Sequence, residues 1–431
     1  MQKDFEVIVV GAGPSGTACA HTLAKAGVKV LLLERGEYPG TKNVMGGVLY
    51  RQATEEIVPE FWKEAPVERH VIEQRYWFTD VDSTVSVSYK GESHGKEPYN
   101  AFTVLRAKFD RWFANKAVKE GAVLITETTV EDLIYKGERV VGVKTGRENG
   151  DVYANVVVLA EGVNSLLAQK AGLRDFIPAN QLAVAVKEVI TLPRGKIEDR
   201  FNLEGEEGIT IELIGETTKG MIGTGFIYTN KDTLSVGVGA LISQITENGY
   251  NPNDLLESMK AHPMVRRLIS GGKSVEYLAH MIPEGGYKGI PRLCRDGLLV
   301  VGDAAMLVNG VHREGSNLAM MSGKIAAETI LKARNHDDYS KPMLQEYEKA
   351  LNNTFVLQDL RHYKNLNTLL EENPHFFKLY PHLANVALDK FFTVDNIPKA
   401  DKQKDIIGSI TKERSLYQIA KDLYRLWRVV G

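Results

Sequence analysis

Short apolar runs alternate with helical patterns over the first part of the chain. Residues 5–10 (FEVIVV) are β-branched and apolar, which is typical of a strand buried on both faces of a parallel sheet. A helical pattern follows to about residue 26, and a second apolar run ends at Glu34. Similar runs occur at 156–159 and 298–301. These periodicities predict an α/β domain built around buried strands.

The pattern changes between about residues 181 and 284. Four segments there alternate apolar and polar positions, as half-buried antiparallel strands do, and residues 71–90 have the same character. From about residue 336 the pattern is helical to the end. The chain is therefore expected to combine an α/β domain, an inserted β-rich part and a helical C-terminal region.

Composition narrows the function classes. The 431 residues include 53 Lys and Arg against 55 Asp and Glu, so the formal charge of −2 gives no reason to expect a nucleic-acid partner. We expect neither a secretory signal nor a membrane-spanning helix. The two cysteines, Cys19 and Cys294, are too few for a four-thiolate iron–sulfur cluster and too far apart for a redox dithiol motif. The chain's own sulfur is not expected to carry electrons.

The strongest motif follows the first strand. Gly11 permits a tight turn, Gly13 admits a pyrophosphate close to the backbone, and Gly16 lets the helix pack on the strand. Glu34 ends the next strand, where a carboxylate accepts ribose hydroxyls and repels a 2′-phosphate. The motif predicts a dinucleotide site but does not decide between NAD and FAD, and the alternative is a glycine-rich turn without a ligand.

Three later segments favour FAD. Arg106 lies at the end of an apolar run ahead of Asp110, a buried strand breaks at 160–162, and a strand ends in Gly302-Asp303 ahead of a helix that begins near 315–317. This order resembles the FAD-binding set of the para-hydroxybenzoate-hydroxylase-like flavoproteins. The resemblance implies that Asp303 holds the ribityl chain and that residues 315–317 face the flavin pyrimidine. The alternative for Asp303 is a simple helix cap. The expected cofactor contacts are Gly11, Gly13, Pro14, Ser15, Gly16, Glu34, Arg35, Met45, Gly46, Gly47, Arg106, Val130, Ala160, Glu161, Gly162, Gly302, Asp303, Gly315, Ser316 and Asn317.

Two stretches, residues 42–50 and 282–291, resemble the electron-transfer-flavoprotein:quinone oxidoreductase family and its FixC subgroup. The long respiratory members carry a C-terminal four-cysteine cluster, which this chain lacks. The resemblance therefore implies electron-transfer flavoprotein subunits and a small ferredoxin-like iron–sulfur subunit as partners. It also implies delivery of electrons to a membrane quinone, menaquinone or ubiquinone. If the complex bifurcates electrons, the chain would be its high-potential outlet.

The predicted fold is α/β: an FAD-binding Rossmann-like domain with an inserted antiparallel β-sheet substrate domain and a helical C-terminal region. The expected boundaries are 1–75, 101–180 and 285–335 for the FAD domain, 76–100 and 181–284 for the quinone or substrate domain, and 336–431 for the helical region.

Two groups are candidates for the quinone reaction. Gly223, Thr224, Gly225 and Phe226 would allow a ligand close to the backbone of the inserted sheet, although a bulge explains the glycines equally well. His312 is a candidate catalytic proton relay, and a loop histidine bonded to the backbone is the alternative.

The C-terminal region offers two surfaces. Residues 372–392 are rich in aromatics, and residues 411–431 form a basic amphipathic pattern that would lie on an anionic membrane or dock a subunit. Packing against the chain's own helices is the alternative for both. The expected location is the cytoplasm, peripheral at the inner face of the cell membrane.

The sequence thus predicts a flavoprotein oxidoreductase that passes electrons from an electron-transfer flavoprotein through FAD to a quinone. Three alternatives remain: a geranylgeranyl-reductase-like isoprenoid reductase, an NAD(P)H-dependent flavin hydroxylase and a non-catalytic flavin-bearing assembly subunit. No second G-x-G-x-x-G is present to hold NAD(P)H in a dedicated domain.

Overall fold

The computed structural model describes residues 3–42 and 45–431, and Asn43 and Val44 of the 42–50 stretch lie outside the described residues. The chain divides into two compact units. The first consists of residues 1–70, 98–182 and 280–361, and the second of residues 71–97, 183–279 and 362–431. Of the residues after 335, those up to 361 belong to the first unit and the rest to the second. The predicted division into three parts remains a prediction.

The first unit is built on a six-stranded sheet in the order β17-β18-β11-β1-β2-β7. From β18 to β7 neighbouring strands run parallel, and β17 joins the edge antiparallel. All residues of β1, β2 and β11 are buried, as the unbroken apolar runs predict. The strands of this unit are β1 (Val7–Val10), β2 (Val30–Leu33), β3 (Val48–Tyr50), β6 (Ala101–Val104), β7 (Val123–Ile125), β8 (Val130–Lys136), β9 (Arg139–Thr145), β10 (Asp151–Tyr153), β11 (Val156–Leu159), β17 (Cys294–Arg295) and β18 (Leu298–Val300).

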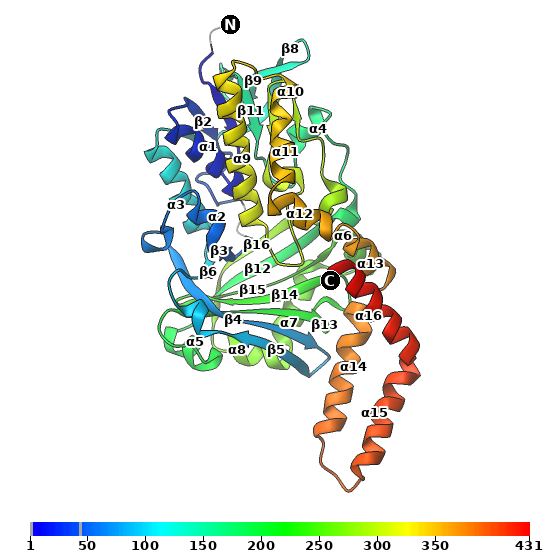
Figure 1. The fold of residues 1–431 in the computed structure, drawn as a ribbon. Helices are drawn as coiled ribbons and strands as arrows, with labels where there is room; N and C mark the ends of the chain where they lie inside the picture. The colour runs from blue at the N-terminus through cyan, green and yellow to red at the C-terminus, as the bar shows by residue number, and fades with distance from the viewer. Residues whose placement is uncertain (1–2, 43–44) are drawn as a thin grey trace. The chain divides into compact units, whose positions relative to one another are not determined.

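Two helices of this unit, α1 and α9, pack closely side by side (Figure 1). The contact requires Gly323, because a Cβ at that position would collide with the backbone oxygen of Ser15. Together with the sheet they enclose one apolar core. The helices are α1 (Pro14–Lys25), α2 (Arg51–Glu55), α3 (Arg106–Lys119), α4 (Leu166–Lys170), α9 (Ser316–Asn335), α10 (Lys341–Leu344), α11 (Glu346–Asn352) and α12 (Phe355–His362), with the short turns η1 (Phe61–Lys63), η3 (Ala179–Gln181), η5 (Gly286–Gly289) and η6 (Gly302–Ala305).

The second unit contains a sheet in the order β16-β12-β15-β14-β13-β4, with β5 paired to β4. The pairs of β12, β13, β14 and β15 are antiparallel, which confirms the predicted antiparallel sheet. One face packs on an apolar core with α5, α7 and α8. The strands are β4 (Val67–Thr79), β5 (Thr84–Lys90), β12 (Leu182–Thr191), β13 (Glu207–Gly215), β14 (Gly223–Thr229), β15 (Thr233–Leu241) and β16 (Lys273–Pro283).

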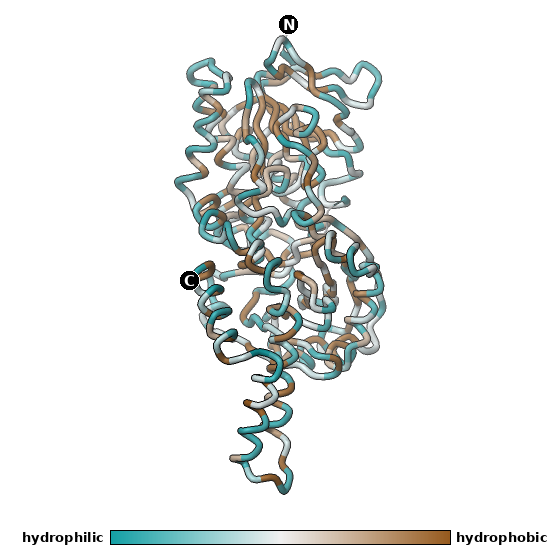
Figure 2. Tube along the Cα trace, turned by 90° about the vertical axis from the view of Figure 1, so that its right-hand side faces the viewer, coloured by the Kyte–Doolittle hydropathy of each residue, from teal (hydrophilic) through white to brown (hydrophobic). Residues whose placement is uncertain are grey.

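The C-terminal helices of the second unit pack on its β4–β5 hairpin through α14. The Asn385 side chain donates to the Phe78 oxygen over 2.8 Å and accepts from the Ser83 hydroxyl over 2.9 Å. Figure 2 shows hydrophobic and hydrophilic residues mixed along the α14–α15 hairpin. The helices are α5 (Arg194–Phe201), α6 (Ile242–Glu247), α7 (Pro252–Ala261), α8 (Pro263–Ile269), α13 (Leu366–Glu372), α14 (His375–Phe392), α15 (Lys399–Glu413) and α16 (Leu416–Val430), with η2 (Glu92–Gly95) and η4 (Glu216–Thr218).

Among the described residues, none of the helices combines the length and apolar character needed to cross a bilayer. The α/β sheet, the antiparallel sheet and the helical C-terminal region confirm the predicted fold class.

Candidate functional site

The turn after β1 has the shape that a phosphate ligand needs. Gly11 adopts φ +103°, and a Cβ there would collide with the Ala160 oxygen. A Cβ at Gly16 would collide with the Gly11 oxygen, so both glycines are required by the turn itself. Gly13 has no neighbour within 4 Å of its Cβ position, which leaves its backbone open to a ligand. Pro14 and Ser15 begin α1, so its unpaired N–H groups lie at the same turn.

Glu34 is held next to this turn. Its carboxylate accepts hydrogen bonds from the Ala12 amide at 3.0 Å and the Gly36 amide at 2.7 Å. Each oxygen therefore keeps a lone pair for a ribose hydroxyl. The Thr128 amide donates to the Glu34 backbone oxygen over 2.9 Å, and this brings the start of β8, with Val130, towards the same region. Arg35 is exposed.

Arg106 and Asp110 form a buried two-pronged ion pair on the first turns of α3. Both guanidinium contacts to the carboxylate measure 2.8 Å, and the side chains are 5% and 2% exposed. The third nitrogen of Arg106 donates to the Met45 oxygen over 2.7 Å and to the Ser316 hydroxyl over 3.4 Å. Burial opposes the charge of Arg106, but the charge and hydrogen bonds of Asp110 raise the pKa of Arg106 above its ordinary value.

This pair fixes the loop of residues 45–47 against the beginning of α9. Gly46 has φ +85°, and its Cβ position lies 3.1 Å from the Arg106 guanidinium. A side chain at this position would therefore be strained as well as crowded. Gly47 is tied to the sheet, because its oxygen accepts from the Val104 amide over 2.9 Å.

Asp303 lies in the turn that follows β18. Burial raises the pKa of its carboxyl to about 6, and the charge of Arg106 opposes this rise. Gly302 has φ +62°, and its amide donates to the Ser322 hydroxyl on α9 over 3.0 Å. Within the described residues, no protein group donates a hydrogen bond to the Asp303 carboxylate. The carboxylate is thus available to a hydroxyl-bearing ligand.

The beginning of α9 completes the candidate site. We call this site the cradle; it consists of the Gly11–Gly16 turn, Glu34, Arg106, Asp303 and residues 315–317. Gly315 precedes the first turn, Ser316 contacts Arg106, and the Asn317 amide donates to Glu314 over 2.9 Å. The helix is 20 residues long, so its N-terminus presents free N–H groups and positive potential.

Glu161 has a structural task that the sequence did not indicate. Its carboxylate accepts from the Leu167 and Ala168 amides, each over 2.9 Å, and so caps α4. Burial raises its pKa, and these hydrogen bonds oppose the rise. Neighbouring Ala160 crowds the glycine turn, whereas Gly162 has φ +76° and open space at its Cβ position. Gly162 rather than Glu161 offers an approach for a ligand.

His280, at the end of β16, was not anticipated from the sequence. Burial, together with the charges of Arg106 and Arg35, lowers its pKa to about 4. Its Nε2 is buried and has no hydrogen-bond partner among the described residues. A neutral imidazole beside two guanidinium groups fits a ligand that carries phosphate or flavin oxygens. Only the fold brings His280 here, since no sequence motif connects it with Arg106.

The remaining candidates lie at other positions. His312 is exposed, and its backbone oxygen accepts from the Tyr50 hydroxyl over 3.1 Å. In β14 of the second unit, the Cβ position of Gly225 points to Met259 in the core, whereas the Phe226 ring stacks on Tyr228 with centroids 4.9 Å apart. Alternation along the strand therefore puts Thr224 and Phe226 on the face opposite the core, and the four residues do not form one contact surface.

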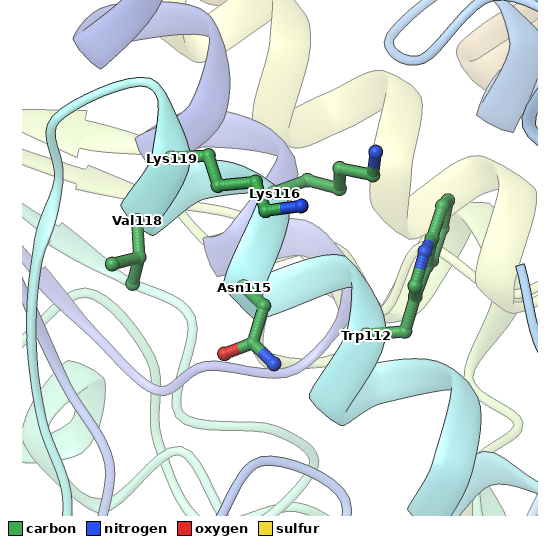
Figure 3. A pocket seen from close by; sticks show the side chains of 5 residues that line it. All are labelled: Trp112, Asn115, Lys116, Val118 and Lys119. Carbon is green, nitrogen blue, oxygen red and sulfur yellow. The ribbon is translucent and has the colours of Figure 1, made fainter. Parts of the chain in front are cut away.

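One surface hollow of the first unit lies along α3, away from the cradle. Figure 3 shows the hollow along α3, about 340 Å³ in volume, which is lined by Trp112, Asn115, Lys116, Val118 and Lys119. All five residues belong to one helix, and Lys116 lies over the Trp112 ring at 5.5 Å. This hollow contains none of the predicted site residues. No cluster of three or more metal-ligating side chains occurs in residues 3–42 and 45–431.

The cradle fits FAD. The open backbone at Gly13 and Gly162, the Asp303 carboxylate without a donor and the unpaired Nε2 of His280 are all features of a ligand site. The pyrophosphate would be held at Gly13 and the start of α1, the ribose at Glu34, and the ribityl chain at Asp303.

Comparisons with known proteins support FAD as the cofactor. The profile of the ETF-QO/FixC family C-terminal domain matches residues 366–431, and two profiles described as FAD dependent oxidoreductase match residues 6–181 and 99–329. Protein FixC of Bradyrhizobium diazoefficiens is 49% identical over 99% of each chain. The probable electron transfer flavoprotein-quinone oxidoreductase YdiS of Escherichia coli is 39% identical over 97% of each chain.

Among solved structures, a geranylgeranyl bacteriochlorophyll reductase-like protein of Thermoplasma acidophilum superposes with a TM-score of 0.75. It covers 99% of each chain at 21% identity, which establishes a common fold alone. The family profiles establish that this chain is an FAD-dependent oxidoreductase.

Asp110→Asn is predicted to destabilise the first unit, because it leaves the Arg106 charge buried without a counter-ion. The expected loss in the free energy of unfolding is ~3–5 kcal/mol. Replacing both partners, Arg106→Met with Asp110→Leu, should cost less than the sum of the single changes. Urea unfolding of Arg106→Met, Asp110→Leu and the double variant measures this, and additive losses would show that the two side chains are not coupled.

Proposed function

The chain belongs to the ETF-QO/FixC family, and from this premise we propose that it passes electrons from an electron-transfer flavoprotein through FAD to a membrane quinone. Bound FAD supplies the redox chemistry, since a flavin exchanges electrons singly or in pairs. The residues of the cradle hold it, orient it and set the charge around it.

Neither of the two cysteines is suited to serve as a second redox group, and this observation carries the proposal. Cys19 and Cys294 are both buried free thiols. Burial raises the pKa of each, so neither is a reactive thiolate at neutral pH. Electrons must therefore enter and leave through the flavin. A small ferredoxin-like iron–sulfur subunit is the proposed further partner, and the chain would be the high-potential outlet if the complex bifurcates electrons.

A polar row on the β-sheet of the second unit is the proposed quinone-contacting surface. The strand pairings align Lys187, Gly237, Phe226 and Glu212 across four neighbouring strands. Lys187 and Glu212 are buried, and Glu212 accepts from the Tyr228 hydroxyl over 3.0 Å. An aromatic ring among hydrogen-bonding groups suits a quinone, which has an apolar ring and two carbonyl oxygens. His312 remains the proposed relay that carries protons to the reduced flavin or to the quinone.

The last helix supports a peripheral membrane contact. Asp422 is its inward-facing residue, 1% exposed, and accepts from the Tyr380 hydroxyl over 2.7 Å and from Arg414. Because this polar side faces the protein, the apolar side faces outward. The exposed apolar residues of α16 are Leu416, Tyr417, Leu423, Tyr424, Trp427 and Val430. Lys421 and Arg428 flank them, the composition of helices that lie at an anionic lipid surface.

The relay is tested with the flavin spectrum of the FAD-loaded protein. Addition of a reduced electron-transfer flavoprotein should bleach the flavin, and a menaquinone analogue should then restore its colour. NAD(P)H alone should leave the flavin oxidised, because the proposed electron donor is the electron-transfer flavoprotein. A flavin that ignores the electron-transfer flavoprotein but is bleached by NAD(P)H would instead favour the isoprenoid reductase or the hydroxylase.

Trp427→Ser is predicted to weaken binding to vesicles that contain anionic lipid. Loss of one buried aromatic contact, ~1.5–3 kcal/mol, corresponds to a binding constant lower by about tenfold or more. Ala420→Ser, a small exchange at an exposed position of the same helix, is the matched control and should bind normally. Equal sedimentation of the two variants with vesicles would remove α16 from the membrane contact.

A further inference from the structure

A second surface hollow of the first unit is formed by residues 173–178, which follow α4, and residues 288–292, which precede β17. Its volume is about 310 Å³. The two segments are tied together, because the Arg292 amide donates to the Leu173 oxygen over 3.1 Å. Leu173 and Ile177 are buried and anchor the first segment. The backbone therefore holds the residues of this hollow in fixed positions.

An aromatic ring and several charged groups meet at the hollow. Phe176 lines it and is 83% exposed. A single exposed aromatic ring is ordinary on a protein surface. Here, however, three cationic side chains and only one carboxylate line the same hollow: Arg174, Lys288, Arg292 and Asp175. The ring therefore lies within a surface of mainly positive charge.

Much of this positive charge is not neutralised by the chain itself. Lys288 and Arg292 are exposed, and neither forms an ion pair within the part of the chain that the structure describes. Arg295, a short way along the chain, is different, because it is paired with Glu138 over 3.2 Å. Lys288 and Arg292 are thus available to a negatively charged partner.

Arg174 connects the hollow to the cradle. One of its terminal nitrogens donates to the Ala304 oxygen over 3.0 Å and to the Ser165 hydroxyl over 3.1 Å. Ala304 follows Asp303 directly in η6. A protein that covers the hollow would therefore be separated by one side chain from the turn that holds the ribityl chain. Electrons pass between proteins only when their cofactors come close, so this position suits an electron carrier.

The composition of the surface indicates which kind of partner fits it. Aromatic and arginine side chains are enriched where proteins dock, and unpaired cations attract an acidic partner and accelerate its association. Permanent subunits bury large, mainly apolar interfaces, whereas electron carriers that bind briefly use small ones. One ring surrounded by solvated charges belongs to the second class.

We propose that this surface docks an acidic face of the electron-transfer flavoprotein that reduces the FAD of this chain. We call it the docking rim, and it consists of Arg174, Phe176, Lys288 and Arg292. The cations attract carboxylates of the donor, and the Phe176 ring packs on an apolar group between them. This inference rests on the proposed electron relay and adds to it the place where the donor binds.

The test is the reduction of the FAD-loaded full chain by reduced electron-transfer flavoprotein, followed by stopped flow. The second-order rate constant of the wild type should fall about tenfold between about 20 and 200 mM salt, because salt screens the attraction. Lys288→Glu should lower this constant about fivefold at low salt and weaken its dependence on salt. Phe176→Ser should raise the donor concentration at half-maximal rate about tenfold at every salt concentration, because an apolar contact is not screened.

Two control variants separate the docking rim from general effects of charge. Lys119→Glu makes the same change of charge at an exposed position of α3 and should keep the wild-type rate constant. Lys288→Arg keeps the charge of the rim and should do the same. Direct photoreduction of the bound FAD needs no donor protein, so it should be equal in all variants and show that the cradle is intact.

Three results would overturn the proposal. The first is a wild-type rate constant that does not respond to salt, and the second is an equal loss of rate in Lys288→Glu and Lys119→Glu or in neither. The third is a Phe176→Ser variant that reacts normally with the donor but loses a tightly bound iron–sulfur subunit, because the rim would then belong to a permanent partner. A wild type that the electron-transfer flavoprotein does not reduce at any salt concentration refutes the proposed function itself.

Discussion

The buried ion pair of Arg106 and Asp110 is the interaction on which the first unit's cradle depends. Removing two charges from water is unfavourable, and here two parallel hydrogen bonds of 2.8 Å offset that cost. The third nitrogen of Arg106 then holds the Met45 carbonyl and contacts Ser316 at the start of α9. Segments from three distant parts of the sequence are thus brought together by one guanidinium group, whose planar fork a lysine does not reproduce.

The charges in the cradle are graded rather than uniform. Arg106 stays positive, His280 stays neutral because burial and two guanidinium charges lower its pKa to about 4, and burial raises the pKa of Asp303 to about 6. The N-terminus of α9 adds positive potential without a further side chain. Such an environment receives negative charge on a bound cofactor without reorganisation, which is the contribution that a protein makes to flavin chemistry.

The sequence predicted those features of the fold and of the cradle that depend on local residue patterns. The buried runs of β1 and β2 and the alternation of β12–β15 are set by the environment of each strand, so they can be read directly. Gly11 is predicted to permit the tight turn and Gly16 to let the helix pack on the strand, and a Cβ at either would collide with backbone atoms. Residues whose roles depend on distant partners were not predictable. Glu161 caps α4, and His280 lies near Arg106 only because of the fold. Asp422 faces the protein interior, which leaves the apolar side of α16 exposed.

The most direct test of the organising role of Arg106 is the affinity of Arg106→Lys for FAD. Lysine keeps the positive charge but cannot bridge Asp110, Met45 and Ser316 at once. The account predicts a dissociation constant for FAD that is higher by about tenfold or more, with Arg111→Lys on the exposed side of α3 binding as the wild type does. Equal FAD affinity of Arg106→Lys and the wild type would contradict it, because charge alone would then suffice and the bridging geometry would have no role.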